Sequence, residues 1–328
     1  MGKWVRCGVL EGAPDLVAEL GGDYRSLARK AGVPEHPLVN PDLPIPVESF
    51  VSFLRLSAEQ FGEETFGLRL GARQTLDQFG PMAALFHSAT TVEEMLQDLT
   101  DYFPLHTQGA IIGMVREPPG LAFTYELSSG SGDLQRQVIE LGFGVLLREL
   151  RRHQPDWTPP EVYLRHGAPI DRHCHRRFLG PNVHYNADRN AILLDQALLD
   201  RPTLQGNRAQ HDPLAASYTA AAQSAKGLDA IRVEALVRMM LPFAPVDIDI
   251  VARRLCRSRR TLQRRLEAES TSFAAIFDQV RAGLARSYLS ESNLLVGEVA
   301  EILQFSETSA LTRAVRRWYG VSPRSIRR

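Results

Sequence analysis

Residues 251–270, which read VARRLCRSRRTLQRRLEAES, begin a pattern that returns later in the chain. VARRLCRS starts at Val251 and VAEILQFS starts at Val299, so Val, Ala, Leu and Ser recur at an offset of 48 residues. After the serines, the matching leucines and arginines recur at an offset of 49. Two helices joined by a short turn form a helix-turn-helix, and repeats of this kind mark repeated structural units. The sequence therefore predicts two helix-turn-helix motifs, with one extra residue at the start of the second motif's second helix.

The residues around the repeat predict an all-α C-terminal domain. Ser258 and Ser306 stand where an N-cap accepts backbone N–H bonds, and they are the predicted caps of the two second helices. The segment FAAIFDQVRAGLARSYL, residues 273–289, is amphipathic and is expected to form a long helix that joins the motifs.

The arginines of the first motif have a predicted orientation. Leu262 and Leu266 lie four residues apart and are expected to face the core, which turns the residues between them outward. In a helix-turn-helix, the second helix meets base edges in the major groove, where Arg binds guanine and Gln binds adenine. The predicted base-contacting residues are Arg260, Gln263, Arg264, Thr308, Ser309, Thr312 and Arg313. The predicted phosphate-contacting residues are Arg253, Arg257, Arg259, Arg265, Arg316 and Arg317.

The charge of the chain is divided unevenly along its length. The whole chain has 38 basic and 38 acidic residues, yet residues 246–328 contain 15 arginines against 9 acidic residues. Arginine suits forked contacts with phosphates and guanine edges. A solvated basic face is the simpler interpretation of one arginine-rich helix, but the repeat and the charge asymmetry together favour a domain that binds double-stranded DNA.

The N-terminal part is expected to be an α+β domain. PVESFVSFLRLSAEQFG (residues 46–62) has a helical apolar stripe, and Thr91 with Glu94 forms a capping-box pattern at the start of another helix. GAIIGMVREPPGLAFTYEL (residues 109–127) predicts a β-hairpin, and AILLD (residues 191–195) predicts a strand.

The composition excludes several classes of protein. No apolar run is long enough for a transmembrane helix, and the first residues are too short an apolar stretch for a signal peptide. Three scattered cysteines favour a reducing compartment, so a cytoplasmic location is expected. No GxSxG, HExxH, P-loop or GxGxxG motif occurs, so we expect neither an enzyme nor a cofactor.

One stretch could carry other chemistry. HGAPIDRHCHRRFLGPNVH gathers His166, His173, Cys174, His175 and His184, which are possible metal ligands. Adjacent residues on a helix diverge by about 100°, so a polar surface loop without a metal is the preferred interpretation. A redox-active Cys174 or Cys256 remains an alternative. A DNA-repair methyltransferase would need a zinc-ligating cysteine set that this chain lacks.

Residues 229–328 resemble the DNA-binding domain of the AraC/XylS family of transcription regulators. SRRTLQRRLEAESTSF resembles its first recognition helix, and VGEVAEILQFSETSALTRAVRRWYGVSPRSIRR resembles its C-terminal signature, including Arg313, Trp318, Gly320, Pro323 and Arg327. The family usually has Gly-Phe where this chain has Gln304-Phe305, and Phe where Leu311 and Val315 stand. A left-handed conformation at Gln304 is expected to cost about 1 kcal/mol.

Residues 20–205 resemble the family's arabinose-binding-like N-terminal domain, in stretches such as TFGLRLGARQTLDQFGPMAALFHSATTVEEML. The resemblance implies a small-molecule effector, a homodimer and contact with RNA polymerase. The expected domains are a segment 1–19, an effector domain 20–205, a linker 206–226 and a DNA-binding domain 227–328. Aromatic and polar residues that are candidates for the effector pocket are Phe86, His87, Tyr102, His106 and Tyr125.

The expected function is therefore sequence-specific DNA binding by a regulator of the AraC type, under the control of a small molecule. Two alternatives stay open at this point. One is a regulator that senses a metal or redox state through Cys174 or Cys256, and the other is an interaction module that does not bind DNA.

Overall fold

The computed structural model describes residues 3–37, 39–107, 110–127, 133–224, 228–241, 245–255, 257–291 and 294–326. It divides into two compact domains, an N-terminal domain (Met1–Ser224) and a C-terminal domain (Ala225–Arg328). Within these residues, no helix combines the length and apolarity that crossing a bilayer would require.

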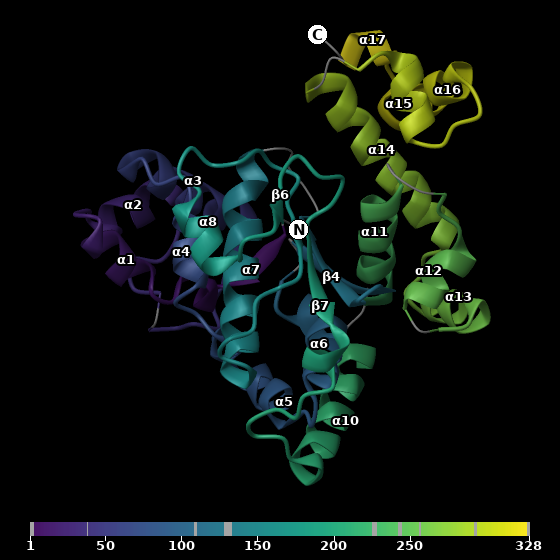
Figure 1. Cartoon of the computed structure of the whole chain (residues 1–328). Coiled ribbons are helices and arrows are strands. Elements are labelled where there is room, and N and C mark those ends of the chain that lie inside the picture. Colours follow the sequence, from purple (N-terminus) through teal and green to yellow (C-terminus); the bar gives the residue numbers. More distant parts are fainter. Residues whose placement is uncertain are drawn as a thin grey trace. The chain divides into compact units, whose positions relative to one another are not determined.

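The N-terminal domain is α+β, as predicted (Figure 1). Its helices are α1 (Ala13–Glu19), α2 (Tyr24–Ala31), α3 (Val47–Phe61), α4 (Phe66–Gly71), α5 (Ala83–Ser88), α6 (Val92–Tyr102), α7 (Asp133–His153), α8 (His173–Phe178), α9 (Gln196–Leu199) and α10 (Arg208–Ser224), with the 3-10 helices η1 (Cys7–Leu10), η2 (Leu76–Met82) and η3 (Phe103–Leu105). Its strands are β1 (Trp4–Arg6), β2 (Pro44–Pro46), β3 (Ala110–Glu117), β4 (Gly120–Leu127), β5 (Val162–Tyr163), β6 (Val183–His184) and β7 (Ala191–Asp195).

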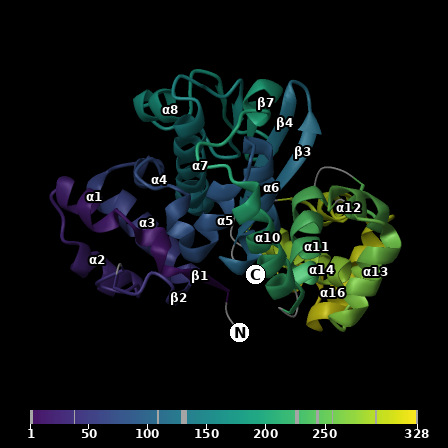
Figure 2. The same cartoon turned by 90° about the horizontal axis from the view of Figure 1, so that it is seen from below.

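The main sheet has the strand order β3-β4-β7-β5-β6. The predicted hairpin is confirmed, because β3 and β4 pair antiparallel from Ala110 opposite Leu127 to Glu117 opposite Gly120. Figure 2 shows β3, β4 and β7 side by side, and α7 packs against β4. The predicted Thr91 cap is also confirmed, since its side chain accepts a hydrogen bond from the Glu94 backbone N–H.

Two glycines of the GLRLG stretch explain how α4 approaches α7. A Cβ atom at Gly67 would lie 2.0 Å from the Gln137 backbone oxygen, and one at Gly71 would lie 2.1 Å from the Leu141 backbone oxygen. Any side chain at these positions would separate the two helices. The glycines therefore serve close helix packing, which holds the α7 face that lines the cavity described below.

Residues 3–19 belong to the N-terminal domain rather than to a separate segment. β1 pairs with β2, and Cys7, Leu10 and Leu16 are fully buried in the domain's core. The expected division between residues 1–19 and 20–205 does not appear in the structure, because the core is built from both ranges.

The predicted linker at residues 206–226 is also different in the structure, because most of it forms α10. This helix packs against α5 and α6, and its Leu214 and Tyr218 contact the core of the N-terminal domain. The alanine-rich composition is typical of an exposed helix, so only these contacts assign α10 to the domain.

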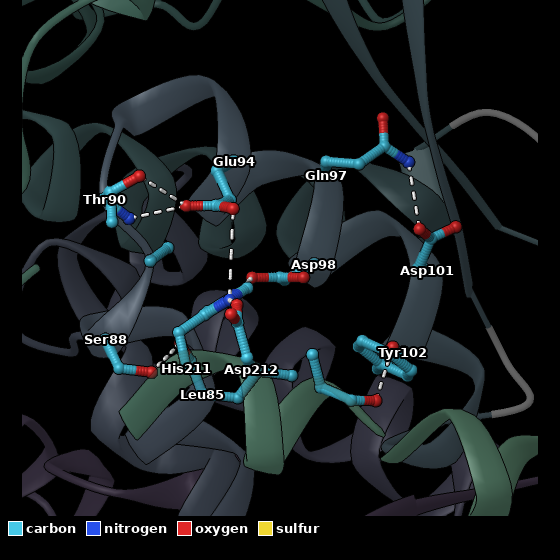
Figure 3. Close-up of polar contacts among 12 residues, drawn as sticks. Leu85, Ser88, Thr90, Glu94, Gln97, Asp98, Asp101, Tyr102, His211 and Asp212 are labelled. Atoms are coloured by element: carbon cyan, nitrogen blue, oxygen red, sulfur yellow. Dashed lines mark hydrogen bonds and ion pairs between the residues drawn. The ribbon is translucent and has the colours of Figure 1, made fainter. Parts of the chain in front are cut away.

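A polar cluster holds α10 in place, as Figure 3 shows. His211 Nε2 lies 2.8 Å from Asp98 Oδ2 of α6, and the Tyr102 hydroxyl lies 2.8 Å from Thr219 Oγ1. Burial raises the pKa of Asp98 to about 6, against the lowering effect of His211. Burial is the largest influence on His211 and opposes its charge, but the hydrogen bonds and negative charges of Asp98, Glu94 and Asp212 together outweigh it and raise the pKa of His211.

The C-terminal domain is all-α among its described residues, as predicted. Its helices are α11 (Leu228–Met240), α12 (Ile248–Arg254), α13 (Arg259–Ala268), α14 (Phe273–Glu291), α15 (Val296–Ile302), α16 (Thr308–Tyr319) and α17 (Pro323–Ile326). The expected long helix is α14, and Figure 1 shows it running from the α11–α13 group to the α15–α17 group. One apolar core extends along it, including Ile276, Val280 and Leu289.

Candidate DNA-binding surface and ligand cavity

The first helix-turn-helix motif consists of α12 and α13, and its local geometry follows the sequence closely. Ser258 is the N-cap of α13, and its hydroxyl accepts a hydrogen bond from the Thr261 backbone N–H at 3.1 Å. Leu262 and Leu266 are fully buried. The predicted cap and the predicted core face are both confirmed, and together they determine which side of α13 faces outward.

The outward face of α13 carries Arg260, Gln263 and Arg264. All three are exposed, and none of their side chains has a hydrogen bond or ion pair with another residue in the described part of the chain. Two guanidinium groups and an amide are thus available to a ligand. The guanidinium donors suit guanine and phosphate groups, and the amide can donate to and accept from adenine.

Asp229 of α11 bonds two arginines of the first motif and so helps to position α13. This residue was not identified from the sequence. Its carboxylate accepts hydrogen bonds from Arg257 Nη1 at 2.6 Å and from Arg265 Nη1 at 3.4 Å. The Asp229 side chain is 9% exposed, so these are largely buried contacts. Glu269, at the end of α13, accepts hydrogen bonds from the backbone N–H groups of Asp229 and Ala230. The two helices are therefore joined at both ends of α13.

The second motif consists of α15 and α16, and its start differs from the prediction. The first helices of the two motifs end at Arg254 and Ile302, 48 residues apart, whereas the second helices begin at Arg259 and Thr308, 49 residues apart. The extra residue therefore lies in the turn and not in the helix. The prediction of Ser306 as N-cap is wrong, because the longer turn places Glu307 at that position.

On the exposed face of α16, unlike that of α13, the polar side chains bond one another and the helix backbone. Arg313 donates to Ser309 Oγ at 3.1 Å and pairs with Glu307 Oε1 at 3.3 Å. The hydrogen bonds from Ser309 and Arg313 lower the pKa of Glu307. Thr312 donates its hydroxyl to the Thr308 backbone oxygen at 3.0 Å. The four polar residues predicted for this face do lie together, but an acidic side chain lies among them.

The arginines predicted to contact phosphates have different surroundings. Arg259 pairs with Asp249 at 3.1 Å, and Arg317 pairs with Asp278 of α14 at 2.5 Å. Arg316 is exposed. Arg257 and Arg265 hold Asp229, as described above. The side chain of Arg253 lies outside the described residues, as do Cys256 and Arg327.

Gln304, in the turn of the second motif, bonds residues that follow α11 and precede α12. Gln304 has a φ of 57°, which confirms the expected left-handed conformation. Its side chain donates to the Leu241 backbone oxygen at 2.9 Å and accepts from the Val246 N–H at 3.4 Å. Arg281 of α14 donates to the Gln304 backbone oxygen at 2.5 Å and stacks on Phe305, 4.3 Å from its ring centroid. Glutamine thus provides contacts at this position that glycine could not.

The N-terminal domain contains a cavity between the β3–β4 hairpin and α7. Alternate strand residues face it, including Ile112 directly opposite Tyr125. From α7 it is lined by a single helical stripe, which is Val138, Leu141, Gly142, Val145 and Leu146. Residues of β1, η1, α3, η2, α6 and η3 complete the lining. Gly142 makes room for the Tyr125 ring, because a Cβ atom there would lie 2.4 Å from it.

Two of the five candidate pocket residues line this cavity, namely His106 and Tyr125. Phe86, His87 and Tyr102 do not. His106 stacks against Phe79 with ring centroids 4.3 Å apart. The sequence could not separate these residues, because the cavity is assembled from segments far apart in the chain.

The histidine- and cysteine-rich stretch is divided between buried residues, His166 and His175, and exposed ones, His173 and His184. His175 of α8 is fully buried, with Nε2 2.9 Å from Glu140 Oε1 and Nδ1 2.9 Å from the Tyr185 hydroxyl. The interpretation as a polar surface loop is therefore wrong for His175. Burial raises the pKa of the Cys174 thiol, which disfavours the reactive thiolate. Among the residues that the structure describes, no three His, Cys, Asp or Glu side chains are placed to hold a metal ion.

Comparison with known proteins adds independent evidence to this geometry. Residues 21–203 match the family model of the arabinose-binding domain of AraC transcription regulators, and residues 251–328 match a helix-turn-helix domain model. The chain is 28% identical to the HTH-type transcriptional regulator VirS of Mycobacterium tuberculosis, covering 100% of this chain and 97% of VirS. It is 25% identical to the ornithine utilization regulator of Pseudomonas aeruginosa, covering 95% of this chain and 93% of that protein.

Among solved structures, the transcriptional regulator CdpR from Pseudomonas aeruginosa aligns at 24% identity with a TM-score of 0.42, covering 83% of this chain and 92% of CdpR. The curated relatives are transcription regulators. The N-terminal family model alone covers more than half of the chain, and the two motifs of the C-terminal domain are those of a DNA-binding protein. The chain belongs to the AraC family of transcription regulators, with an N-terminal ligand-binding domain and a C-terminal helix-turn-helix domain that binds DNA.

Proposed function

We propose that the first motif reads most of the operator sequence, through Arg260, Gln263 and Arg264. The observation that carries this proposal is the exposed face of α13, on which these three side chains have no partner in the described chain. Thr308, Ser309, Thr312 and Arg313 of α16 make the second set of base contacts. Glu307 repels phosphates beside that set, so its contribution to affinity is smaller.

The phosphate contacts that we propose come from Arg253, Arg257, Arg259, Arg265, Arg316 and Arg317. Several of these pair with aspartates in the free protein. A guanidinium group has five N–H donors, so an arginine held by Asp229 or Asp278 still has donors for a phosphate. The aspartates would then orient the arginines before DNA binds, which lowers the entropy lost on association.

The two motifs of one chain would bind successive major-groove segments about 34 Å apart on one face of DNA. A homodimer would bind two such pairs of sites, and RNA polymerase would be the partner through which the bound regulator acts. The effector would bind in the cavity of the N-terminal domain. It must have different affinities for two states of the protein, because only a differential affinity shifts an equilibrium.

A footprint tests the DNA-binding part of this proposal. The full-length protein is incubated with the DNA upstream of its own gene, with excess unrelated DNA as competitor, and cleaved with DNase I. We expect two protected segments about one helical turn apart. Gln263→Ala should relax one base position in a library of operator variants, whereas Gln210→Ala, on α10, should leave selection unchanged. Protection that unrelated DNA abolishes completely would refute sequence-specific binding.

A further inference from the structure

The cavity of the N-terminal domain has a lining that selects among ligands by charge. Its walls are mainly aliphatic and aromatic, with Phe50, Phe79, Phe103 and Phe123 among them. No lysine, arginine, aspartate or glutamate lines it among the described residues. An ion transferred from water into such surroundings loses its hydration and finds no charged side chain in the lining to pair with, which is strongly unfavourable. A carboxylate or an ammonium group therefore has no favourable position there.

Two polar side chains in the lining have atoms without a hydrogen-bond partner. Gln78 is 7% exposed and its Oε1 has no partner, and His106 is 3% exposed and its Nδ1 has none. Burial, with a contribution from the charge of Arg6, lowers the pKa of His106 to about 3, so the imidazole is neutral at physiological pH. A buried polar atom without a partner has an energetic cost, because it has lost its hydrogen bonds to water and gained none. A ligand that supplied the missing hydrogen bonds would remove this cost.

We propose that the effector of this regulator is a small, neutral and mainly apolar molecule with a hydroxyl or similar donor group, which it places against Gln78 and His106. The inference rests on the proposed location of the effector site and adds its chemical class. Gln78 Oε1 can only accept a hydrogen bond, so the ligand must donate one. The neutral imidazole of His106 accepts or donates according to its tautomer. Charged amino acids and multiply hydroxylated sugars do not fit this site.

The size of the cavity limits the ligand. Its volume is ≈ 70 Å³, counted over positions open to the centre of a water molecule. One buried water needs roughly 10–15 Å³ of such space, so the cavity has room for on the order of five to seven waters. An organic molecule of about six to ten non-hydrogen atoms fills the same space. This is the size of a six-carbon alcohol or of a phenol.

Four probes of similar size test separately whether the ligand must be neutral and whether it must donate a hydrogen bond. They are 1-hexanol, hexanoate, hexylamine and 1-methoxypentane, which is neutral but has no donor. Each is titrated into the full-length protein and followed by thermal unfolding and by calorimetry. A ligand at ten times its Kd raises the Tm by roughly 3–6 °C for a domain of this size. We expect this rise with 1-hexanol, a smaller one with 1-methoxypentane and none with the two ions. Binding should show a negative change in heat capacity, because apolar surface is buried.

Variants then place the binding in this cavity. Gln78→Leu should abolish the preference for 1-hexanol over 1-methoxypentane, which amounts to about tenfold or less in affinity. Ala110→Met, at the start of β3, should fill the cavity and remove binding of all probes. Gln154→Leu is the matched control, because Gln154 also has a buried Oε1 without a partner but does not line the cavity. It should bind like the unchanged protein.

Three outcomes would overturn the inference. Hexanoate or hexylamine binding as tightly as 1-hexanol would refute a neutral ligand. Binding of 1-hexanol that survives both Ala110→Met and Gln78→Leu would place it elsewhere. Failure of every probe would refute the apolar class. The footprint without any probe tests DNA binding independently of the ligand. If the ligand class is wrong but the proposed DNA binding is right, the operator stays protected.

Discussion

The two helix-turn-helix motifs of the C-terminal domain have the same sequence pattern but present different surfaces to DNA. α13 is capped by the Ser258 side chain and carries two exposed arginines without a partner. α16 begins at Thr308, and its N-cap residue Glu307 forms an ion pair with Arg313 on the exposed face of the helix. The repeated core residues thus place the second helix in the same way in both motifs, but the charges on the exposed faces of the two helices differ.

The aspartates that bind arginines of the two motifs differ in burial. Asp229 is 9% exposed and binds two arginines of the first motif, whereas Asp278 is 46% exposed and binds Arg317 and the Trp318 indole N–H. Ion pairs in water contribute little, while buried charges that lose their partners are costly. The comparison teaches that the first motif has both the more buried support and the larger number of exposed arginines without a partner among the described residues.

The largest expected effect comes from removing the two aspartates. Asp229→Asn should destabilise the first motif by about 1.5–3 kcal/mol, because hydrogen bonds to a buried charge are lost. Asp278→Asn should cost the second motif about 1 kcal/mol or less, because water screens this pair. Hydrogen exchange of peptides from α13 and α16 measures each motif separately. If hydrogen exchange accelerated equally in the two variants, the difference between the buried and the exposed aspartate would have no effect on stability.

Next come the arginines that occupy matching positions of the repeat. Arg264→Ala should weaken operator binding by about 1–3 kcal/mol and relax one base position. Arg313→Ala should weaken it by less than about 1 kcal/mol, because Glu307 already neutralises part of its charge. Fluorescence anisotropy with the footprinted DNA gives both values, and circular dichroism checks that each variant is folded. A larger loss for Arg313→Ala would transfer the main readout to the second motif.

The third test exchanges two residues in left-handed conformations for glycine. Ser270 and Gln304 have φ values of 59° and 57°. Ser270→Gly should stabilise the domain by about 0.5–1 kcal/mol, since glycine adopts this conformation without strain. Gln304→Gly should stabilise nothing, because it also loses the bonds to Leu241 and Val246. Thermal unfolding distinguishes a rise in Tm for Ser270→Gly from no rise for Gln304→Gly. A rise in both variants would show that the Gln304 contacts contribute nothing.

The smallest effect is expected from the acidic residue at the start of α16. Glu307→Gln removes a negative charge near DNA and releases Arg313, so affinity should rise. The slope of log K against log salt should steepen by up to about 0.9, the value for one added phosphate contact. Glu301→Gln, an exposed residue of α15, is the matched control. If both substitutions change the slope equally, the change comes from the net charge of the protein. It would then not come from release of Arg313 by Glu307.

Local pattern predicted the parts of the site that depend on neighbouring residues. The spacing of Leu262 and Leu266 predicted the buried side of α13, and the hydroxyl before the helix predicted its cap. The same reasoning failed at Ser306. An offset of one residue in a repeat does not say whether the extra residue lies in the turn or in the helix, because both choices keep the later leucines in register.

The sequence by itself determined the two motifs, the long helix between them and the β-hairpin, since each follows from periodicity, capping or turn chemistry within a few residues. Only the tertiary structure decided that Asp229 holds the arginines of the first motif, that α10 belongs to the N-terminal domain, and that Gln78 and His106 meet in one cavity. The contacts of Asp229 and α10 join residues that are 28 to 117 positions apart along the chain. No local propensity encodes them, because they exist only once the apolar core has brought those segments together.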